Sequence, residues 1–357
     1  MMPFLTEHHG DPGRLHAEGR ATRVAIEDAR EQVAELVGAR PREVVFGASG
    51  TEAINTAVWG AHARGMRHGR NHVVTTAVEH SAVLDAVRRR GAVTIVGTDA
   101  RGRFAAEEVV AAIRPDTVLV SIQLANHEVG TLQPAAEVCA AVRDQEVLVH
   151  VDACAAVGHV PMSFADLDAD LCSITAHKLG GPKGAGALLV RRGLRLEALV
   201  LGGAQERARR GGLENVPAIV GFGAACAALT ADDRLGVEAR DAAALVERAS
   251  AVLADLGVER FGDPDPAGRL PYLLCFGVEG VEAEPILLAL DQHGVAVHSG
   301  SACSSELLEP SPVLAAMGVD ADHSLRVSVG WNTTAADVDR FVSSLPPIVS
   351  RFRQLRS

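Results

Sequence analysis

The 357-residue chain contains only two lysines, Lys178 and Lys183, both within Ala-His-Lys-Leu-Gly-Gly-Pro-Lys-Gly at 176–184. Arginine suffices for surface charge, whereas lysine can lose its proton and attack an aldehyde as a neutral amine. One of these lysines is therefore a candidate to form a Schiff base. Lys178 directly follows a predicted strand and has His177 beside it, whereas Lys183 lies in a Gly-Pro-Lys-Gly turn typical of a solvated loop. We favour Lys178.

A candidate partner for this lysine is Asp152, which ends the apolar run Val-Leu-Val-His-Val-Asp at 147–152. A carboxylate at the end of a strand can hold a protonated ring nitrogen and increase the ring's capacity to accept electrons. When the aspartate is considered without the other motifs, the alternative is that it caps a helix or forms a salt bridge. Asp152 and Lys178 end neighbouring predicted strands, so both can reach one small ring.

The segment 47–55, Gly-Ala-Ser-Gly-Thr-Glu-Ala-Ile-Asn, follows a predicted strand and begins a predicted helix. Free N–H groups at the helix start, the small residue Gly50 and the hydroxyl of Thr51 predict an anion site that suits a phosphate. An ordinary capped turn is the alternative when the segment is taken alone.

Cys303 lies in His-Ser-Gly-Ser-Ala-Cys-Ser-Ser at 298–305, and a cysteine in a Gly/Ser-rich loop suits a nucleophile. The other five cysteines lie in apolar or alanine-rich runs typical of buried positions, although Cys154 borders the candidate site. The six cysteines include no CxxC pair, which favours reduced thiols in a cytoplasmic protein over a disulfide or zinc framework.

Short apolar runs alternate with helical patterns over the first two thirds of the chain. Strands are predicted at 43–46, 72–75, 93–96, 117–122, 146–150, 171–174 and 187–190. Continuous apolar strands separated by helices predict an α/β fold with a mainly parallel seven-stranded sheet sandwiched by helices. Ligands of such sheets bind beyond the carboxyl ends of the strands. A long helical stretch and further short strands, one of them at 294–298, predict a smaller α+β domain, giving domains 1–235 and 236–357.

The composition limits the classes of molecule that the protein is expected to bind. The formal charge of −11 argues against nucleic acid or an anionic membrane as the main partner. The chain is 48% apolar with a mean hydropathy of +0.15, typical of a globular protein with a sizeable core. The longest uncharged apolar stretch, Val216–Thr230, is too short to span a membrane and predicts a buried helix. No basic-then-apolar leader opens the chain.

Taken together, these segments resemble the cysteine desulfurases, which are pyridoxal-phosphate enzymes of fold type I in the class V aminotransferase group. The resemblance covers nearly the whole chain, and its specificity comes from seven motifs in the same order. The motifs are Glu-His at 79–80, Asn-His-Glu-Val-Gly-Thr at 126–131, His-Val-Asp-Ala at 150–153, His-Lys-x-x-Gly-Pro-Lys-Gly at 177–184, Gln-Glu-Arg at 205–207, Ser-Gly-Ser-Ala-Cys at 299–303 and Leu-Arg-Val-Ser at 325–328.

The resemblance implies a role for each matching residue. It assigns the Schiff base to Lys178, the pyridine nitrogen to Asp152 and the sulfur-accepting thiol to Cys303. Further residues would hold the cofactor or the substrate: Gly50, Thr51, Thr175 and His177 at the phosphate, His80 stacked on the ring, Asn126 near the cofactor's hydroxyl and the substrate, and Arg326 at the substrate carboxylate. His80 is also a candidate proton shuttle, because histidine exchanges protons near neutral pH. Helix capping for His80 and a surface ion pair for Arg326 are the alternatives.

The implied reaction converts L-cysteine to L-alanine and passes sulfur as a persulfide on Cys303 to an acceptor protein, for example in iron–sulfur cluster assembly. The implied protein is a homodimer without a metal. A selenocysteine lyase or a specialised C–S lyase would keep the cofactor and change the outcome. A catalytically weak sulfur-transfer partner or scaffold is an alternative of another class.

Three departures from the family pattern accompany the resemblance. About twenty N-terminal residues that usually border the active site have no counterpart here. A glutamine three residues after the site aspartate is replaced by Ala155, which removes a hydrogen bond worth about 0.5–1.5 kcal/mol. Leu213 stands where a threonine usually reaches the phosphate of the partner subunit. These changes predict weaker retention of the cofactor or a specialised site.

Overall fold

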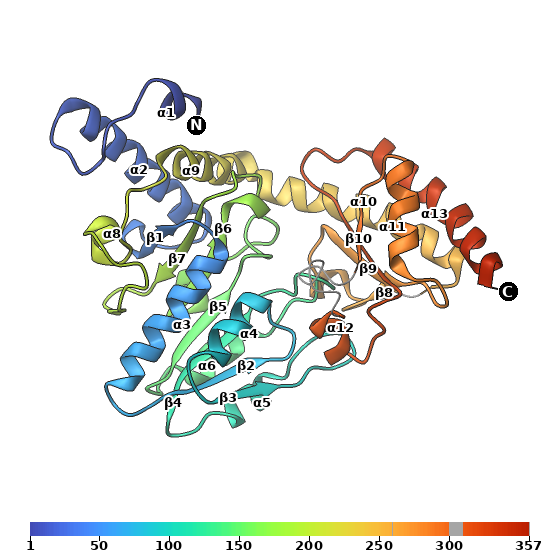
Figure 1. Cartoon of the computed structure of the whole chain (residues 1–357), viewed down its shortest axis with the longest axis horizontal. Coiled ribbons are helices and arrows are strands. Elements are labelled where there is room, and N and C mark those ends of the chain that lie inside the picture. The colour runs from blue at the N-terminus through green and yellow to red at the C-terminus, as the bar shows by residue number, and fades with distance from the viewer. Residues whose placement is uncertain (259, 300–309, 357) are drawn as a thin grey trace.

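The computed structural model describes residues 1–258, 260–299 and 310–356 of the chain (Figure 1). Among these residues, the larger sheet has seven strands in the order β1-β7-β6-β5-β4-β2-β3. Their bounds are β1 Val44–Gly47, β2 His72–Thr76, β3 Val93–Val96, β4 Thr117–Gln123, β5 Leu148–Asp152, β6 Leu171–Thr175 and β7 Gly186–Val190. Strands β3, β2, β4, β5 and β6 are parallel, whereas β7 is antiparallel to both of its neighbours. The predicted mainly parallel seven-stranded sheet is confirmed.

Helices cover both faces of this sheet, as the apolar strands require. Val73 and Leu119 point towards α3 and α4, whereas the next residues along, Val74 and Val120, belong to the core on the other face. The helices of this part are α1 Met2–Thr6, α2 Ala17–Leu36, α3 Gly50–Met66, α4 Ser81–Arg88, α5 Ala106–Ala111, α6 Ala135–Val142, α7 Phe164–Leu167, α8 Gln205–Ala208 and α9 Val216–Thr230.

A second, antiparallel sheet lies in the C-terminal part, with the strand order β10-β11-β9-β8. Its strands are β8 Arg260–Phe261, β9 Leu273–Gly277, β10 His298–Ser299 and β11 Ser324–Ser328, and its helices are α10 Arg234–Leu256, α11 Ala283–Gln292, α12 Pro312–Ala316 and α13 Ala335–Arg356. The strand predicted at 294–298 is wrong in its bounds, since β10 begins only at His298. The division of the chain at residue 235 stays a prediction. It falls at the start of α10, whose Leu235 packs on the first core and whose Val246 belongs to the second.

Helices α9 and α10 follow one another closely, so that Val216–Leu256 is long and apolar enough to cross a membrane by length and composition alone. The side chains of α9 point instead into the core of the larger part, where Ile219, Phe222 and Cys226 are buried beside α2. A core helix passes the same test of length and composition. The packing of α9 agrees with the buried helix predicted for Val216–Thr230.

The Gln-Glu-Arg motif holds the first strand in place. Glu206 accepts two hydrogen bonds of 2.7 Å from the buried guanidinium of Arg30 and a third from the backbone N–H of Phe46. The guanidinium also donates to the carbonyl of Val44. Glu206 has a φ of 47°, a left-handed conformation that costs energy in a residue with a side chain. The buried ion pair joins α2, β1 and α8.

Candidate active site

A cavity of about 230 Å³ lies at the carboxyl edge of the larger sheet, where the sequence predicted the ligand site. It lies beyond the ends of β4, β5 and β6 and at the start of α3. Its lining consists of Ser49, Gly50, Thr51, Ile54, His80, Gln123, Ala125, His127, Asp152, Cys154, Ala155, Thr175, His177 and Lys178. Seven of the predicted cofactor-binding residues are in this lining.

Asp152 and Lys178 are brought to the same cavity. Asp152 is the last residue of β5, and Lys178 ends a short 3₁₀ turn that follows the neighbouring strand β6. One carboxylate oxygen of Asp152 accepts a hydrogen bond from the backbone N–H of Cys154 at 3.0 Å, which fixes the orientation of the carboxylate. Lys183 lies on the exposed turn and lines neither this cavity nor the one beside it. An amine and an oriented acid therefore face one enclosed space.

The predicted phosphate cradle lies at the start of α3. Ser49 caps this helix by accepting a hydrogen bond from the N–H of Glu52, while the N–H groups of the first turn have no acceptor within the helix. A Cβ added at Gly50 would lie 2.5 Å from the sulfur of Cys154, so only glycine fits here. The same added Cβ would lie 3.4 Å from the Cβ of Thr175, whose hydroxyl is joined to His177 by a hydrogen bond of 3.0 Å.

These residues fit the pyridoxal phosphate that the resemblance implies. The first turn of α3 supplies N–H donors for a phosphate, and Asp152 supplies an acceptor for a protonated ring nitrogen. Burial, followed by the charges of Lys178 and Lys183, lowers the pKa of His177. A neutral His177 can still donate one hydrogen bond to an anion. The cavity thus offers donors for the anionic end of such a ligand and an acceptor for its ring nitrogen.

His80 lines the cavity and caps α4 at the same time. Its Nδ1 accepts a hydrogen bond of 3.0 Å from the backbone N–H of Ala82, so Nε2 carries the proton of the neutral ring. The cap fixes the imidazole while its other edge faces the cavity. The ring of His127 lies 5.0 Å from that of His80 between centroids. Ring stacking and proton transfer by His80 stay predictions.

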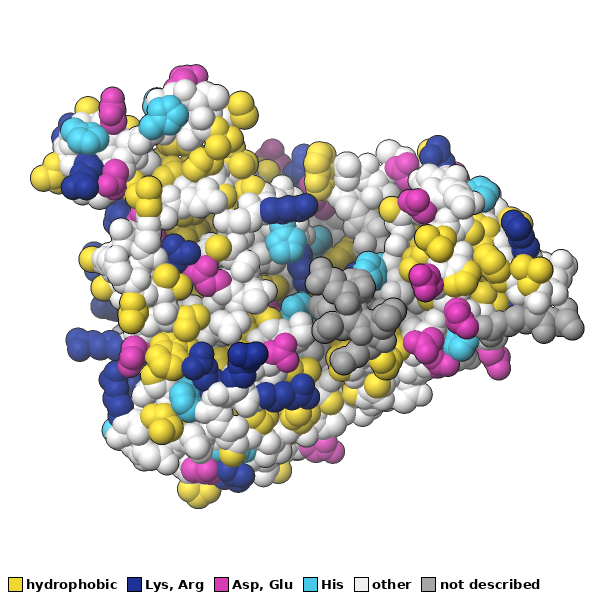
Figure 2. All heavy atoms as spheres, viewed as in Figure 1, with side chains coloured by type: hydrophobic (Ala, Val, Ile, Leu, Met, Phe, Trp, Pro, Cys, Tyr) yellow, Lys and Arg dark blue, Asp and Glu magenta, His cyan; other side chains and the backbone are white. Residues whose placement is uncertain are grey.

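A larger cavity of about 620 Å³ adjoins the first and shares four residues with it: His80, His127, His177 and Lys178. Arg326 on β11 lines this larger cavity and donates a hydrogen bond of 3.2 Å to the carbonyl of His127. A guanidinium and the candidate lysine thus face one space between the two parts of the chain. Figure 2 shows histidine side chains gathered on this face of the molecule.

Asn126 departs from its predicted place. Its side chain is fully buried and lines neither cavity. The carboxamide oxygen accepts hydrogen bonds from the N–H groups of Glu128 and Val129, and its nitrogen donates to the carbonyl of Val78. In this structure Asn126 shapes the turn that presents His127 to the cavity.

Sequence reasoning missed two further polar residues at this edge. Gln123 ends β4 opposite Asp152 and lines the cavity, one residue beyond the predicted strand. Its backbone N–H donates to Glu79, a fully buried carboxyl that also accepts from Thr76 and has one oxygen without a partner. Burial, followed by the charge of Asp152, raises the pKa of Glu79 to about 8. The motif Glu-His at 79–80 was the available signal.

Cys303 lies outside the described residues. The other five cysteines are free thiols that are all buried. Burial raises the pKa of each of them, for Cys139 and Cys275 to about 12. Cys154 is the one that lines the cavity, and burial and the charge of Asp152 both disfavour its thiolate. These five thiols are poor nucleophiles where they stand.

The three departures noted in the sequence have structural counterparts. Residues lining the two cavities begin at Ser49, while α1 packs against α9. Ala155 lines the smaller cavity, and its carbonyl accepts a hydrogen bond from the hydroxyl of Tyr272. The side chain of Leu213 is 64% exposed, so it contributes nothing to the cavity of its own chain.

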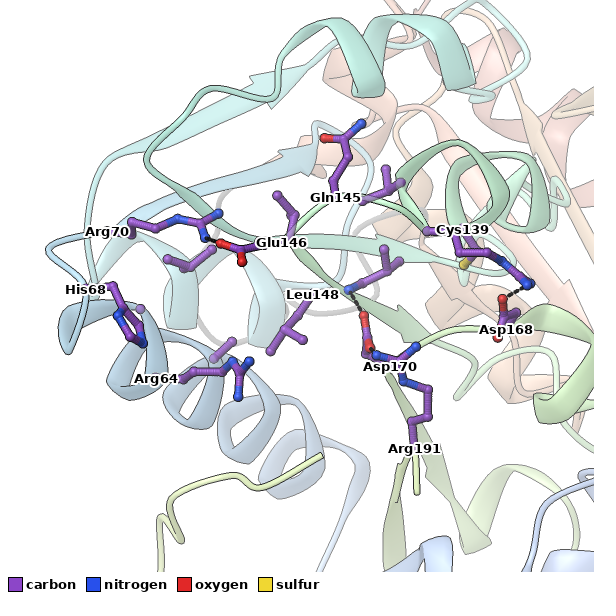
Figure 3. Close-up of a pocket in the computed structure, with 17 residues that line it drawn as sticks. Arg64, His68, Arg70, Cys139, Gln145, Glu146, Leu148, Asp168, Asp170 and Arg191 are labelled. Carbon is purple, nitrogen blue, oxygen red and sulfur yellow. Dashed lines mark hydrogen bonds and ion pairs between the residues drawn. The ribbon is translucent and has the colours of Figure 1, made fainter. Parts of the chain in front are cut away.

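A third cavity, of about 370 Å³, lies at the other end of the sheet, beside the first residue of β5 (Figure 3). Its charged side chains pair with one another: Arg191 contacts Asp170 at 2.6 Å, Arg70 contacts Glu146 at 3.6 Å, and Arg143 contacts Asp168. Strand β5 separates it from Asp152 by roughly 13 Å of extended chain. Three ion pairs thus join six of the charged side chains that line this cavity.

Comparison with known proteins agrees with this geometry. The aminotransferase class-V family matches residues 1–341. A cysteine desulfurase from Gluconacetobacter diazotrophicus is 41% identical, with 99% of this chain and 90% of the relative covered. The cysteine desulfurase IscS of Methanosarcina thermophila is 38% identical, with 99% of this chain and 89% of the relative covered. A solved NifS-like protein superimposes with a TM-score of 0.90 at 32% identity, covering 98% of this chain and 94% of that one.

Proposed function

Because this chain belongs to the aminotransferase class-V family, we propose that it is a pyridoxal-phosphate-dependent cysteine desulfurase. One observation of this structure supports the proposal above all others. Asp152, at the end of β5, and Lys178, just after the neighbouring strand β6, line a single cavity together with the first turn of α3. Bound there, the cofactor would supply an electron sink for negative charge at the substrate's α-carbon.

Each of the main residues around the two cavities has a separate role in the proposed reaction. Lys178 would hold the cofactor, and its Nζ is the atom that takes the proton from the substrate's α-carbon. Arg326, which lines the larger cavity together with Lys178, binds the substrate carboxylate with a planar pair of donors. His80 lines both cavities with its Nδ1 fixed by the cap, so its Nε2 is the atom that exchanges protons with the substrate.

We assign the sulfur-accepting thiol to Cys303, since the other cysteines are buried with raised pKa values. The carbon–sulfur bond of L-cysteine breaks and a sulfur–sulfur bond forms on Cys303. The sulfur atom is oxidised, and the β-carbon, which takes up a proton, is reduced, leaving L-alanine. No further oxidant is needed. An acceptor protein then takes the sulfur from the persulfide.

We further propose a cytoplasmic homodimer. Two large apolar side chains, Leu201 and Leu213, are 79% and 64% exposed on adjacent segments, which the bond from the N–H of Gly211 to the carbonyl of Val200 joins. Exposed leucines on neighbouring segments suit a contact with a second copy. Free, buried thiols suit a reducing compartment.

Incubation of the pyridoxal-phosphate-loaded protein with L-cysteine tests the reaction. We expect L-alanine in solution and the added mass of one sulfur atom on the peptide that contains Cys303. Cys303→Ser should abolish this addition, and Cys154→Ser should leave it unchanged. Pyruvate and ammonia in place of alanine would instead support a C–S lyase, and sulfide release undiminished in Cys303→Ser would refute the role of this cysteine.

A further inference from the structure

Tyr272, the only tyrosine of the chain, connects the two parts of the molecule. It immediately precedes β9 of the smaller sheet. Its hydroxyl donates a hydrogen bond of 3.1 Å to the carbonyl of Ala155, and its ring lies 4.0 Å from that of His159 between centroids. Both partners belong to the segment that follows Asp152. The contact therefore joins the smaller sheet to the edge of the candidate active site.

His159, which contacts Tyr272, also forms a hydrogen bond to the backbone of the candidate lysine. Its Nε2 lies 2.7 Å from the backbone carbonyl of Lys178. Because a carbonyl can only accept, Nε2 bears the proton and donates it. Burial lowers the pKa of His159, which agrees with a neutral ring that has one donor. The imidazole thus holds the turn on which Lys178 stands.

Arg326 is fixed to the same tyrosine through the smaller sheet. Strand β11, which carries Arg326, pairs with β9, and the N–H of Val329 donates to the carbonyl of Tyr272 at 3.0 Å. Tyr272, His159, Arg326 and Lys178 all line the larger cavity. A continuous set of contacts therefore runs from the arginine through Tyr272 and His159 to the backbone of the lysine.

We propose that Tyr272 and His159 are positioning residues that set the separation between Arg326 and Lys178, and so the orientation in which an α-amino acid is held. The inference rests on the proposed function and deepens it, since it concerns how substrate is presented. When Arg326 holds the carboxylate of a substrate, the α-carbon reaches Lys178 only if the two sheets keep their relative position. Neither residue needs to touch the reacting atoms.

Substitutions of Tyr272 and His159 test whether these residues set the position of the substrate. Tyr272→Phe keeps the ring and removes one hydrogen bond, so KM for L-cysteine should rise about 2- to 10-fold. His159→Leu removes the donor to Lys178 and should lower kcat as well as raise KM. His159→Gln places an amide N–H near the position of Nε2 and should restore most of the loss. Phe276→Leu, in the buried core of β9, is the matched control for destabilisation of the same sheet.

A binding measurement separates positioning from stability. L-alanine carries the carboxylate that Arg326 would hold, whereas ethylamine does not, and the absorbance of the loaded holoenzyme reports the binding of each. Tyr272→Phe and His159→Leu should reduce the preference for L-alanine over ethylamine, as Arg326→Ala does, while Phe276→Leu should keep it. Because this readout needs no turnover, it stands even if the protein fails to release sulfur from cysteine. An unchanged preference in both variants would overturn the proposal.

Discussion

Asp152 ends β5, and Lys178 ends the short 3₁₀ turn that follows the neighbouring parallel strand β6, whose Ser173 is paired with Asp152. Strand β6 and the turn after it carry Lys178 to the cavity that Asp152 also lines. The parallel arrangement matters here because it brings the carboxyl ends of consecutive strands to one edge. Residues 26 positions apart in the chain thus become the amine and the acid of one site.

The first prediction concerns the two lysines. Lys178→Ala should abolish the visible absorbance of bound pyridoxal phosphate and lower turnover by about 10²-fold or more, since the amine holds the cofactor and acts as the base. Lys183→Ala is the control, because that side chain is exposed and lines neither cavity. Absorbance spectra and alanine formation measure both effects. If only Lys183→Ala lost the absorbance, Lys183 and not Lys178 would be the lysine that holds the cofactor.

The second prediction concerns Arg326. Arg326→Gln should raise KM for L-cysteine about 10- to 100-fold, because a hydrogen bond to a charged carboxylate is lost. Arg326→Lys should recover little of this loss, since an ammonium lacks the planar pair of donors. Steady-state kinetics at saturating cofactor gives both values. An unchanged KM in Arg326→Gln would mean that the substrate carboxylate is bound elsewhere.

Much of this arrangement was predictable from sequence because it depends on local patterns. Unbroken apolar runs identify buried parallel strands, and residues just after such runs lie at the edge where ligands bind. Asp152 and Lys178 were found in this way. The antiparallel direction of β7 was not, because an apolar run does not show in which direction its strand crosses the sheet.

Residues placed by tertiary contact were beyond this reasoning. Tyr272 reaches Ala155 across 117 positions, and an aromatic residue before a strand predicts only a core. For Asn126 the resemblance predicted a place at the cofactor, whereas its carboxamide bonds to the N–H groups of Glu128 and Val129 and to the carbonyl of Val78. The polar motif at 126–131 indicated a site, but the residue it brings to the cavity is His127.

The third prediction concerns the ion pair between Arg30 and Glu206. Both side chains are only 1% exposed, so removing the charge of Glu206 leaves the buried guanidinium of Arg30 with Glu27 as its remaining anionic partner. Glu206→Gln should lower the free energy of unfolding by about 3–5 kcal/mol. Arg210→Gln is the control, because its partly exposed pair with Glu52 should contribute little. Urea denaturation gives the free energy of unfolding of both variants. Equal losses of free energy would contradict the greater contribution of the buried pair.

The fourth prediction concerns the buried carboxyl of Glu79. Burial raises its pKa from 4.5 to about 8, the charge of Asp152 adds to the rise, and the hydrogen bonds from Thr76 and Gln123 and the charge of His127 oppose it. Between these two pH values the unfolded chain ionises this carboxyl while the folded protein keeps it protonated. The stability contributed by the protonated form is complete below pH 4.5 and is lost as pH rises to about 8.

Glu79→Gln removes this titration and keeps an oxygen for Thr76 and for the N–H of Gln123. Compared with the variant, the wild-type protein should therefore lose free energy of unfolding steadily from pH 5 to pH 8, by a few kcal/mol in total. Denaturation at a series of pH values gives the difference directly. A difference that stays constant over this range would show that Glu79 is already ionised at pH 5 in the folded protein, stabilised by contacts stronger than its two hydrogen bonds.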